Sequence, residues 1–470
     1  MVLEHRLLPT WRSILGIALP SSAMNVAAPL LVTGQSMLLG HSPQGAIALA
    51  AYGSVVTTVS LATRVSSFLC DASSANVGAS IGERNWAKLA RGIQTSILYA
   101  VALGLLSVIL LTGLKPVVFG RILRLDGPVL VASTQYFLLA VMKVPFTLVG
   151  LVMNGVLQGI RQNNALAGTA ACFSLLEFVL DWSAVRLATN LCPGRSLLWK
   201  FGVIGIVMQA LQTTATGVML LRLKPVEADE GFSLYRELIT EDVASDASEV
   251  ENDGFGFALK SGMTHMLARS LIMQSTFAIA LLCVSRLPEP TSALAAHHVI
   301  SNVWMLISYF VDGLSAASIV LGTRLRAQAD PGALTTLNVR CLAAGLIVGL
   351  VVMLGLLLGE DAVIKFYIGD ASGATRALLM GAWPLVAAAQ PLNGPLFVID
   401  GILCGGQDYS FISRAYAVGF LLVFLPLIVS PLRLSLMGIW GTKAGFNVYR
   451  CAAALLWVKG DMDKYNVFNG

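Results

Sequence analysis

The six-residue stretch NGVLQG at residues 154–159 recurs as DGILCG at residues 400–405, 246 positions later. A second match, LAA at residues 49–51 and again at residues 294–296, has an offset of 245 positions. Two short matches share nearly the same offset, and this offset is about half the length of the chain. They indicate that the second half repeats the first.

The composition is that of a membrane protein. Of 470 residues, 56% are apolar and only 12% are charged, and the mean hydropathy is +0.76. Soluble domains carry about 25% charged residues. A chain this apolar needs lipid around it, because water could not solvate its surface.

We predict an all-α polytopic membrane protein with twelve transmembrane helices in two pseudo-symmetric six-helix lobes. The apolar runs lie near residues 14–39, 46–70, 93–114, 128–155, 164–188, 201–222, 256–285, 292–321, 338–359, 377–404, 409–430 and 434–458. Because each half holds an even number of helices, both insert with the same orientation. Parallel repeats of this kind are typical of secondary transporters, whose sites lie between or inside the halves.

The predicted domains are an N-lobe at residues 1–223, an acidic cytoplasmic linker at 224–254 and a C-lobe at 255–470. Residues 224–253 contain ten acidic and two basic side chains, which favours a solvated tether. Phosphorylation of linker serines is the alternative interpretation. Lys and Arg are more frequent in the loops on the side of the linker and both termini, so this side should face the cytosol-like compartment.

Several function classes lack their motifs. The seven cysteines are scattered, with no CxxC and no Cys/His cluster, so buried thiols are expected rather than a metal site. No GxSxG, HExxH or Walker A motif occurs, and no GxGxxG follows a strand. We therefore expect no enzyme activity, no cofactor, no nucleic-acid partner and a monomer. The first twelve residues are charged and precede a spanning run, unlike a signal or transit peptide.

Motifs along the whole chain resemble one family. ALP at 18–20 followed by Gln35 and Gly40 is similar to helix 1 of the multidrug and toxic compound extrusion (MATE) family. Further similar stretches are GER at 82–84, VPF at 144–146, GIRQN at 159–163, LAAHH at 294–298, YFVDGL at 309–314, DGILCGGQD at 400–408 and GIW at 438–440 followed by Phe446 and Arg450. The histidine pair at 297–298 and SSFL at 66–69 resemble the DinF-type branch, including eukaryotic plastid-type members.

The resemblance implies two lobes around a V-shaped cavity, and alternating access in which inward H⁺ or Na⁺ is exchanged for an exported organic solute. It also implies a multi-pass protein of the plasma membrane or of an organelle such as the plastid envelope. The alternatives are Na⁺ coupling, or a flippase or scaffold of the same fold. No cofactor beyond the coupling ion is expected.

Ionisable residues inside spans are costly and therefore mark candidate sites. Glu177 and Asp181 are four residues apart, hence on one helix face, and two close carboxylates suit uptake and release of a proton. Asp181 matches an Asp of the family, Glu177 replaces an Asn, and Gln35 stands where the family has an Asp on helix 1. The structural alternative is that the two acids are bonded to Arg64, to Lys143 or to a backbone group.

The second half offers Asp400, Asp312, His265 and Gln274 for substrate or cation handling. Asp400 matches an acid of the family; the alternative is a hydrogen-bonding role. Asp312 precedes a glycine and could instead mark a helix break, and His265 is favoured as a core histidine. Basic residues within spans make organic anions candidates beside cations: Arg64, Lys143, Arg269 and Lys443. Apolar cavity-lining candidates are Phe68, Phe146, Met153, Phe173, Met208, Met273 and Trp304, although core or lipid packing is favoured for each.

Overall fold

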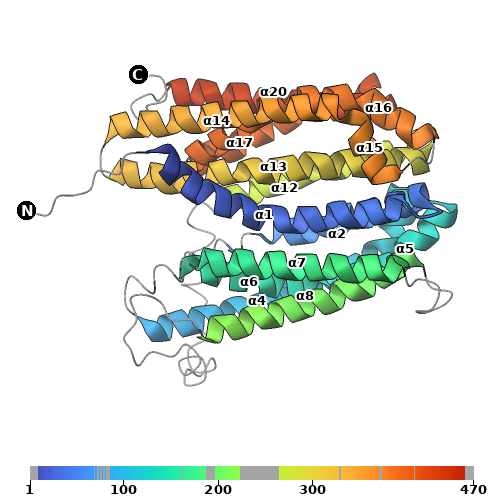
Figure 1. Cartoon of the computed structure of the whole chain (residues 1–470), viewed down its shortest axis with the longest axis horizontal. Coiled ribbons are helices and arrows are strands. Elements are labelled where there is room, and N and C mark those ends of the chain that lie inside the picture. The colour runs from blue at the N-terminus through green and yellow to red at the C-terminus, as the bar shows by residue number, and fades with distance from the viewer. Residues whose placement is uncertain are drawn as a thin grey trace, which may run out of the picture. The chain divides into compact units, whose positions relative to one another are not determined.

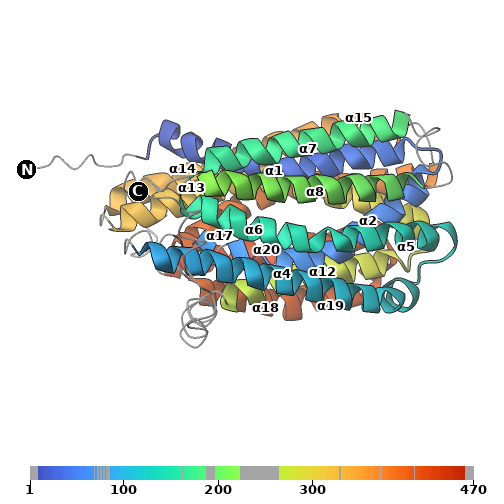
Figure 2. The same ribbon diagram turned by 90° about the horizontal axis from the view of Figure 1, so that it is seen from below.

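A computed structural model describes residues 9–67, 69–70, 73–74, 77, 80, 85–160, 162–186, 196–222, 264–327, 330–369, 373–406 and 408–460. Every regular element in these ranges is a helix (Figures 1 and 2). The first half holds α1 (Trp11–Gly40), α2 (Gly45–Val65), α4 (Trp86–Pro116), η1 (Val117–Ile122), α5 (Gly127–Met142), α6 (Val144–Gly159), α7 (Asn163–Arg186) and α8 (Leu197–Arg222). The second holds α12 (Thr264–Val284), α13 (Pro290–Ala327), α14 (Pro331–Leu358), α15 (Glu360–Ile368), α16 (Gly373–Ala388), α17 (Gln390–Gly405), α18 (Tyr409–Gly419), η4 (Phe420–Phe424), α19 (Leu425–Val429), η5 (Pro431–Leu434) and α20 (Leu436–Gly460).

The all-α membrane class is confirmed. Within the described residues, ten helices are long and apolar enough to cross a membrane, and α16 with α17 forms an eleventh span bent by 51°. Helix α20 covers the twelfth predicted range and carries Lys443, Arg450 and Lys459. Within the described residues, each of the twelve predicted ranges therefore overlaps a helix or a broken helix, because a spanning segment is specified by its own hydropathy.

The described helices group into two compact units, which we treat separately. The first comprises residues 1–46 and 279–470, hence α1 and α13–α20, and the second comprises residues 47–278. This grouping follows contacts rather than sequence order, because α1 packs along α13 (Figure 1). The predicted lobes, residues 1–223 and 255–470, divide the chain by its sequence repeat rather than by contacts, and their boundaries stay a prediction. The linker at 224–254 lies outside the described residues.

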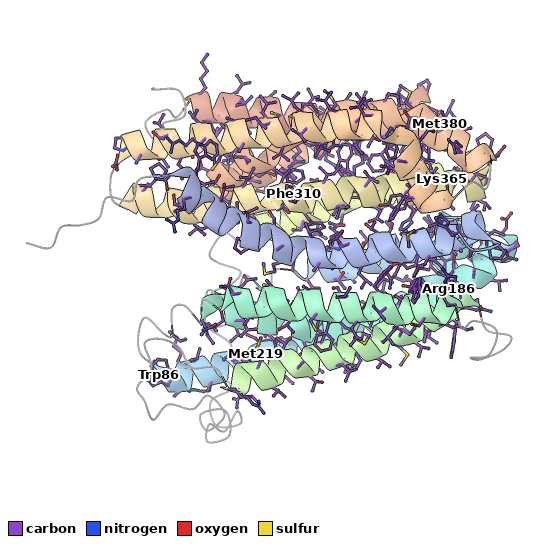
Figure 3. The ribbon with its side chains drawn as sticks, viewed as in Figure 1. Trp86, Arg186, Met219, Phe310, Lys365 and Met380 are labelled. Carbon is purple, nitrogen blue, oxygen red and sulfur yellow. The ribbon has the colours of Figure 1, made fainter. Side chains whose placement is uncertain are left out.

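The packing of α1 against α13 bears on Asp312, for which a helix break was the structural alternative. Helix α13 runs without interruption through Asp312 and Gly313, so no helix break lies there. A Cβ on Gly313 would collide with Ser22 and the Ala18 carbonyl of α1. The Ser22 hydroxyl donates a hydrogen bond of 2.7 Å to the carbonyl of Phe310, which Figure 3 labels. The glycine thus serves close helix packing, as small residues do in membranes.

The internal repeat is visible in the packing within each unit. The break between α5 and α6 falls at Lys143, and the break between α16 and α17 at Ala389, 246 residues later. A Cβ on Gly155 of α6 would collide with the backbone of Cys70, and one on Gly401 of α17 with that of Ser315. The same relation holds for Gly104 against Pro145 and for Gly349 against Pro391. Equivalent glycines therefore hold equivalent neighbours in both halves.

Candidate functional site

A buried ion pair in the first unit joins Asp400 of α17 to Arg450 of α20. Arg450 Nη2 lies 2.7 Å from Asp400 Oδ2, and the two side chains are 3% and 8% exposed. The hydroxyl of Tyr416, on α18, donates to the same Asp400 oxygen at 2.8 Å. The guanidinium also hydrogen-bonds that hydroxyl and lies 4.2 Å from the centre of the Tyr416 ring. Three helices are thereby tied together at one carboxylate.

Buried amides extend this cluster along α20 and α17. Arg450 Nη1 donates to Asn447 Oδ1 at 3.0 Å, and Asn447 Nδ2 donates to Asn393 Oδ1 at 2.9 Å. Asn393 Nδ2 then donates to Gln390 Oε1 at 3.3 Å, and Gln390 Nε2 to the Val386 carbonyl at 2.7 Å. Each side chain in this series donates a hydrogen bond to the next, from Arg450 to the Val386 carbonyl. A change at Asp400 is therefore coupled to the polar contacts that hold α17 against α20.

This arrangement defines what Asp400 can do. Its Oδ2 already accepts hydrogen bonds from a guanidinium and a phenol, so a proton or a cation that binds this oxygen must displace at least one donor. Asp400 was predicted as a site residue, but its partners were not. Arg450 entered only through the family resemblance, and Tyr416, Asn393 and Asn447 were missed. Polar residues at 443, 447 and 450, on one helical face of an apolar span, were the signal available.

The second unit holds Glu177 and Asp181 on α7. Asp181 is fully buried, and Glu177 is 6% exposed. Lys143 Nζ, from the break between α5 and α6, lies 3.5 Å from Glu177 Oε1. Both carboxylates interact electrostatically with the phenols of Tyr52 and Tyr136, whose ring centres are 5.5 Å apart. The structure thus brings the two predicted acids into one neighbourhood and places Lys143, one of the predicted partners, beside Glu177.

Local sequence explains this geometry. Pro145 interrupts the helix just after Lys143, because proline cannot donate the backbone hydrogen bond that would continue it. A Cβ on Gly205 of α8 would lie 3.3 Å from Glu177 Oε1 and 3.6 Å from Lys143 Nζ. The absence of a side chain at Gly205 leaves room for the ion pair beside α8.

The other predicted residues are placed as follows. Gln35 is 6% exposed on α1 of the first unit, whereas Glu177 belongs to the second. Asp312 is half-buried on α13, and Gln274 is half-buried on α12. His265 is exposed at the start of α12, so its interpretation as a core histidine is wrong; it precedes the apolar part of that helix. Phe68 lies outside the described residues.

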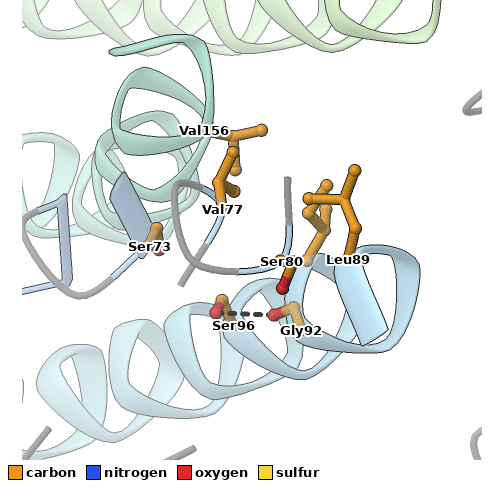
Figure 4. A pocket seen from close by; sticks show the side chains of 8 residues that line it. Ser73, Val77, Ser80, Leu89, Gly92, Ser96 and Val156 are labelled. Carbon is orange, nitrogen blue, oxygen red and sulfur yellow. Dashed lines mark hydrogen bonds between the residues drawn. The ribbon is translucent and has the colours of Figure 1, made fainter. Parts of the chain in front are cut away.

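A small cavity in the second unit is separate from these residues. This cavity is lined by Ser73, Val77, Ser80, Leu89, Gly92, Ile93, Ser96 and Val156 (Figure 4). The Ser96 hydroxyl donates to the Gly92 carbonyl at 2.7 Å. None of the predicted site residues lines this cavity.

Comparison with known proteins identifies the family. The MatE family model matches residues 20–183 and again residues 266–429. The two matches are offset by 246 residues, the offset of the internal repeat, and together they cover more than half the chain. The chain belongs to the MATE family. Members are transporters rather than enzymes, and the many apolar helices make this one an integral multi-pass membrane protein.

Relatives in Arabidopsis thaliana are similar over much of the chain. Protein DETOXIFICATION 45, chloroplastic, is 22% identical over 378 residues, which are 78% of this chain and 61% of that protein. Protein DETOXIFICATION 44, chloroplastic, is 22% identical over 456 residues, 94% of this chain and 80% of that one. The chain thus spans about three fifths of the length of the first of these relatives. The similarity confirms plastid-type relatives.

Solved structures share the fold. An inward-facing multidrug resistance MATE transporter is similar with a TM-score of 0.76 and 13% identity, over 97% of this chain and 99% of that one. A eukaryotic MATE transporter has a TM-score of 0.71 and 15% identity, over 95% of each chain. A transporter from Pyrococcus furiosus, described as having a binding pocket of reverse polarity, has a TM-score of 0.72 and 15% identity, over 98% of this chain and 97% of that one.

Proposed function

We propose that the protein is a secondary active antiporter that exports small organic solutes in exchange for H⁺ by alternating access. The observation that carries this proposal is Asp181, a fully buried carboxylate inside a span, one helical turn from Glu177. A buried acid inside the membrane is costly and is typical of proton pathways. The MATE fold supplies the transporter architecture in which such an acid can load and release a proton.

Each carboxylate has a distinct role in this proposal. Asp181 exchanges the proton, and Glu177, held by Lys143, sets the local charge that Asp181 experiences. Asp400 responds to substrate, because a cation or proton that binds its Oδ2 displaces Arg450 or Tyr416. Gln35, Asp312, Gln274 and His265 are proposed as additional polar contacts for substrate or coupling ion. The protein would act as a monomer, with its termini on the cytosolic side of the plasma membrane or of an organellar envelope.

Flux measurements in proteoliposomes test this function. The two probes are radiolabelled benzamidinium and benzenesulfonate, a planar cation and a planar anion of similar size. We expect an imposed pH gradient to drive the flux of at least one probe above that in protein-free liposomes. Flux driven only by a Na⁺ gradient would instead establish Na⁺ coupling. Absence of flux with both gradients, while a general flippase assay with fluorescent lipids is positive, would replace the proposal by a flippase function.

A further inference from the structure

A second polar cluster in the first unit lies between α13 and α20. The rings of His297 and Trp440 are 5.5 Å apart between centres, and those of Trp304 and Trp440 are 5.3 Å apart. Lys443 Nζ lies 5.3 Å from the centre of the Trp440 ring. All four side chains are buried, with exposures between 1% and 4%. None of these four side chains has a role in the transport function proposed above.

Two polar atoms of this cluster are unsatisfied. Trp440 Nε1 and His297 Nδ1 are buried and have no hydrogen-bond partner in the part of the chain that the structure describes. Trp383, in the same unit, differs, because its Nε1 donates to the Leu356 carbonyl at 2.8 Å. Buried polar groups in native proteins are nearly always hydrogen-bonded, and each exception needs an explanation. Two unsatisfied nitrogens on neighbouring rings indicate that a group of a ligand forms the missing hydrogen bonds with both.

The chemistry of the cluster specifies the ligand. An indole nitrogen can only donate. The hydroxyl of Ser301 lies 3.4 Å from His297 Nε2; when this hydroxyl donates, Nε2 is the acceptor, and Nδ1 carries the ring proton and is a second donor. The Lys443 ammonium adds a positive charge close to both rings. Donors and positive charge together suit the oxygens of an anion.

We propose that Trp440, His297 and Lys443 form a binding subsite for the oxyanion group of an organic anion, such as a carboxylate or a sulfonate. This inference rests on the transport function proposed above and names its substrate class. The aromatic faces of Trp304 and Trp440 would contact the organic part of the substrate. The cluster is enclosed in this conformation, so the substrate enters through the helix movement that alternating access supplies.

The charge of the neighbouring cluster is compatible with this substrate. Asp400, an acid predicted as a site residue in this half, already accepts hydrogen bonds from Arg450 and Tyr416. Its negative charge is compensated within its own ion pair, which weakens its repulsion of an incoming anion. A cationic substrate, by contrast, would approach Lys443 as a like charge and be repelled by it.

Equilibrium binding to the purified full chain in nanodiscs tests the subsite. The probes are radiolabelled benzenesulfonate, its neutral isostere benzenesulfonamide and the cation benzamidinium. We expect benzenesulfonate to bind most tightly, and Lys443→Met to weaken it at least about tenfold, the effect of losing one charge-assisted hydrogen bond. Trp440→Phe keeps the ring but removes the donor, and should weaken binding several-fold. Lys443→Arg keeps the charge and should retain most of the affinity.

Two variants outside the cluster serve as controls. Lys365→Met removes an exposed lysine of α15 (Figure 3), and Trp11→Phe removes an indole N–H at a tryptophan that is 46% exposed. Both should bind benzenesulfonate like the unaltered protein. Thermal unfolding of each variant shows whether a loss of binding reflects a loss of folding, and affinity is compared only among variants with unchanged unfolding temperatures.

The outcomes separate the two proposals. The subsite is wrong if benzenesulfonate binds no more tightly than benzenesulfonamide, or if Lys443→Met and Trp440→Phe, both folded, bind it normally. Inorganic sulfate that displaces the probe at equal concentration would show a site for small free anions, which also overturns the substrate class. Benzamidinium flux driven by a pH gradient, without benzenesulfonate binding, would preserve the antiporter and reject the subsite. Specific benzenesulfonate binding without any gradient-driven flux would support the subsite and reject the antiporter.

Discussion

The two halves of the molecule share their scaffold but differ in their charges. Gly155 and Gly401 are equivalent in the repeat, and each leaves room for an equivalent backbone neighbour. Their polar surroundings are not equivalent. In the first half, helices α5 and α6 contribute the cation Lys143, which pairs with Glu177; in the second half, helix α17 contributes the anion Asp400, which pairs with Arg450.

Each half therefore contains an ion pair at the repeated helix, but that helix carries the opposite sign in each. Lys143 corresponds to Ala389, and Asp400 corresponds to Asn154. Close packing at a glycine admits no substitute, because a Cβ would collide with backbone. A charge is free to change position so long as a partner changes with it, since only an unpaired buried charge is strongly penalised. The duplication has thus kept the contacts that fix shape while the chemistry of the two halves diverged.

The largest expected effect comes from Arg450→Met. This change leaves Asp400 buried without its cation, and losing one partner of a buried pair costs about 3–5 kcal/mol. We expect loss of folded protein and of transport, measured by thermal unfolding in detergent and by proteoliposome flux. The double variant Arg450→Met with Asp400→Asn removes both charges and should recover most of the stability. A folded, fully stable single variant would contradict the importance of the pair.

Next comes Asp181→Asn, which should abolish flux driven by a pH gradient while expression and thermal stability stay near normal. The amide has nearly the same shape as the acid but cannot exchange a proton in the functional pH range. The measurement is flux between pH 6 and 8. Asp126→Asn, an acid at the start of α5 outside the predicted spans, is the matched control and should transport normally. Full activity of Asp181→Asn across this range would remove Asp181 from the coupling mechanism.

The repeated scaffold predicts two equal effects. Gly155→Ala and Gly401→Ala each place a methyl group against a packed backbone and should each cost about 1–3 kcal/mol. Thermal unfolding of the two variants, side by side, makes the comparison. Gly113→Ala in α4 is the control, because nothing lies within 4 Å of its Cβ position. If one repeat tolerates alanine and the other does not, the two packing contacts are not equivalent.

A smaller effect is expected for the ion pair of the first half. The Lys143 side chain is 31% exposed and lies 3.5 Å from Glu177, so solvent weakens the attraction. A double-mutant cycle with Lys143→Met and Glu177→Gln should give a coupling energy of about 1 kcal/mol or less in stability. Coupling as large as that between Asp400 and Arg450 would show that the two pairs are equally buried in the membrane.

The smallest expected effect is that of shortening the linker. Its excess of acidic residues argues against a packed domain, and about ten residues suffice to connect two helix ends. Deletion of residues 228–250 should leave membrane insertion and flux unchanged, as measured by expression and proteoliposome assay. Loss of insertion would show that the linker is required for the folding of the protein and does not merely join the two repeats.

The sequence by itself determined the helices, the duplication and the acids worth testing. Hydropathy is a local property, so the twelve apolar runs located the spans, and an offset of 246 residues located the repeat. Asp181, Glu177 and Asp400 stood out because charged residues inside such runs are rare.

Only the tertiary structure decided which side chains meet. The partners of Asp400 come from α18 and α20, and Lys143 was one of several candidates for Glu177 until the helices were packed. Packing also placed α1 beside α13, and it showed that α13 continues through Asp312, where a helix break was the alternative interpretation. The physical reason is that hydropathy and periodicity fix where a helix lies along the chain and which face is polar. Its neighbours and its rotation against them depend on small residues at each interface, and thus on the whole fold.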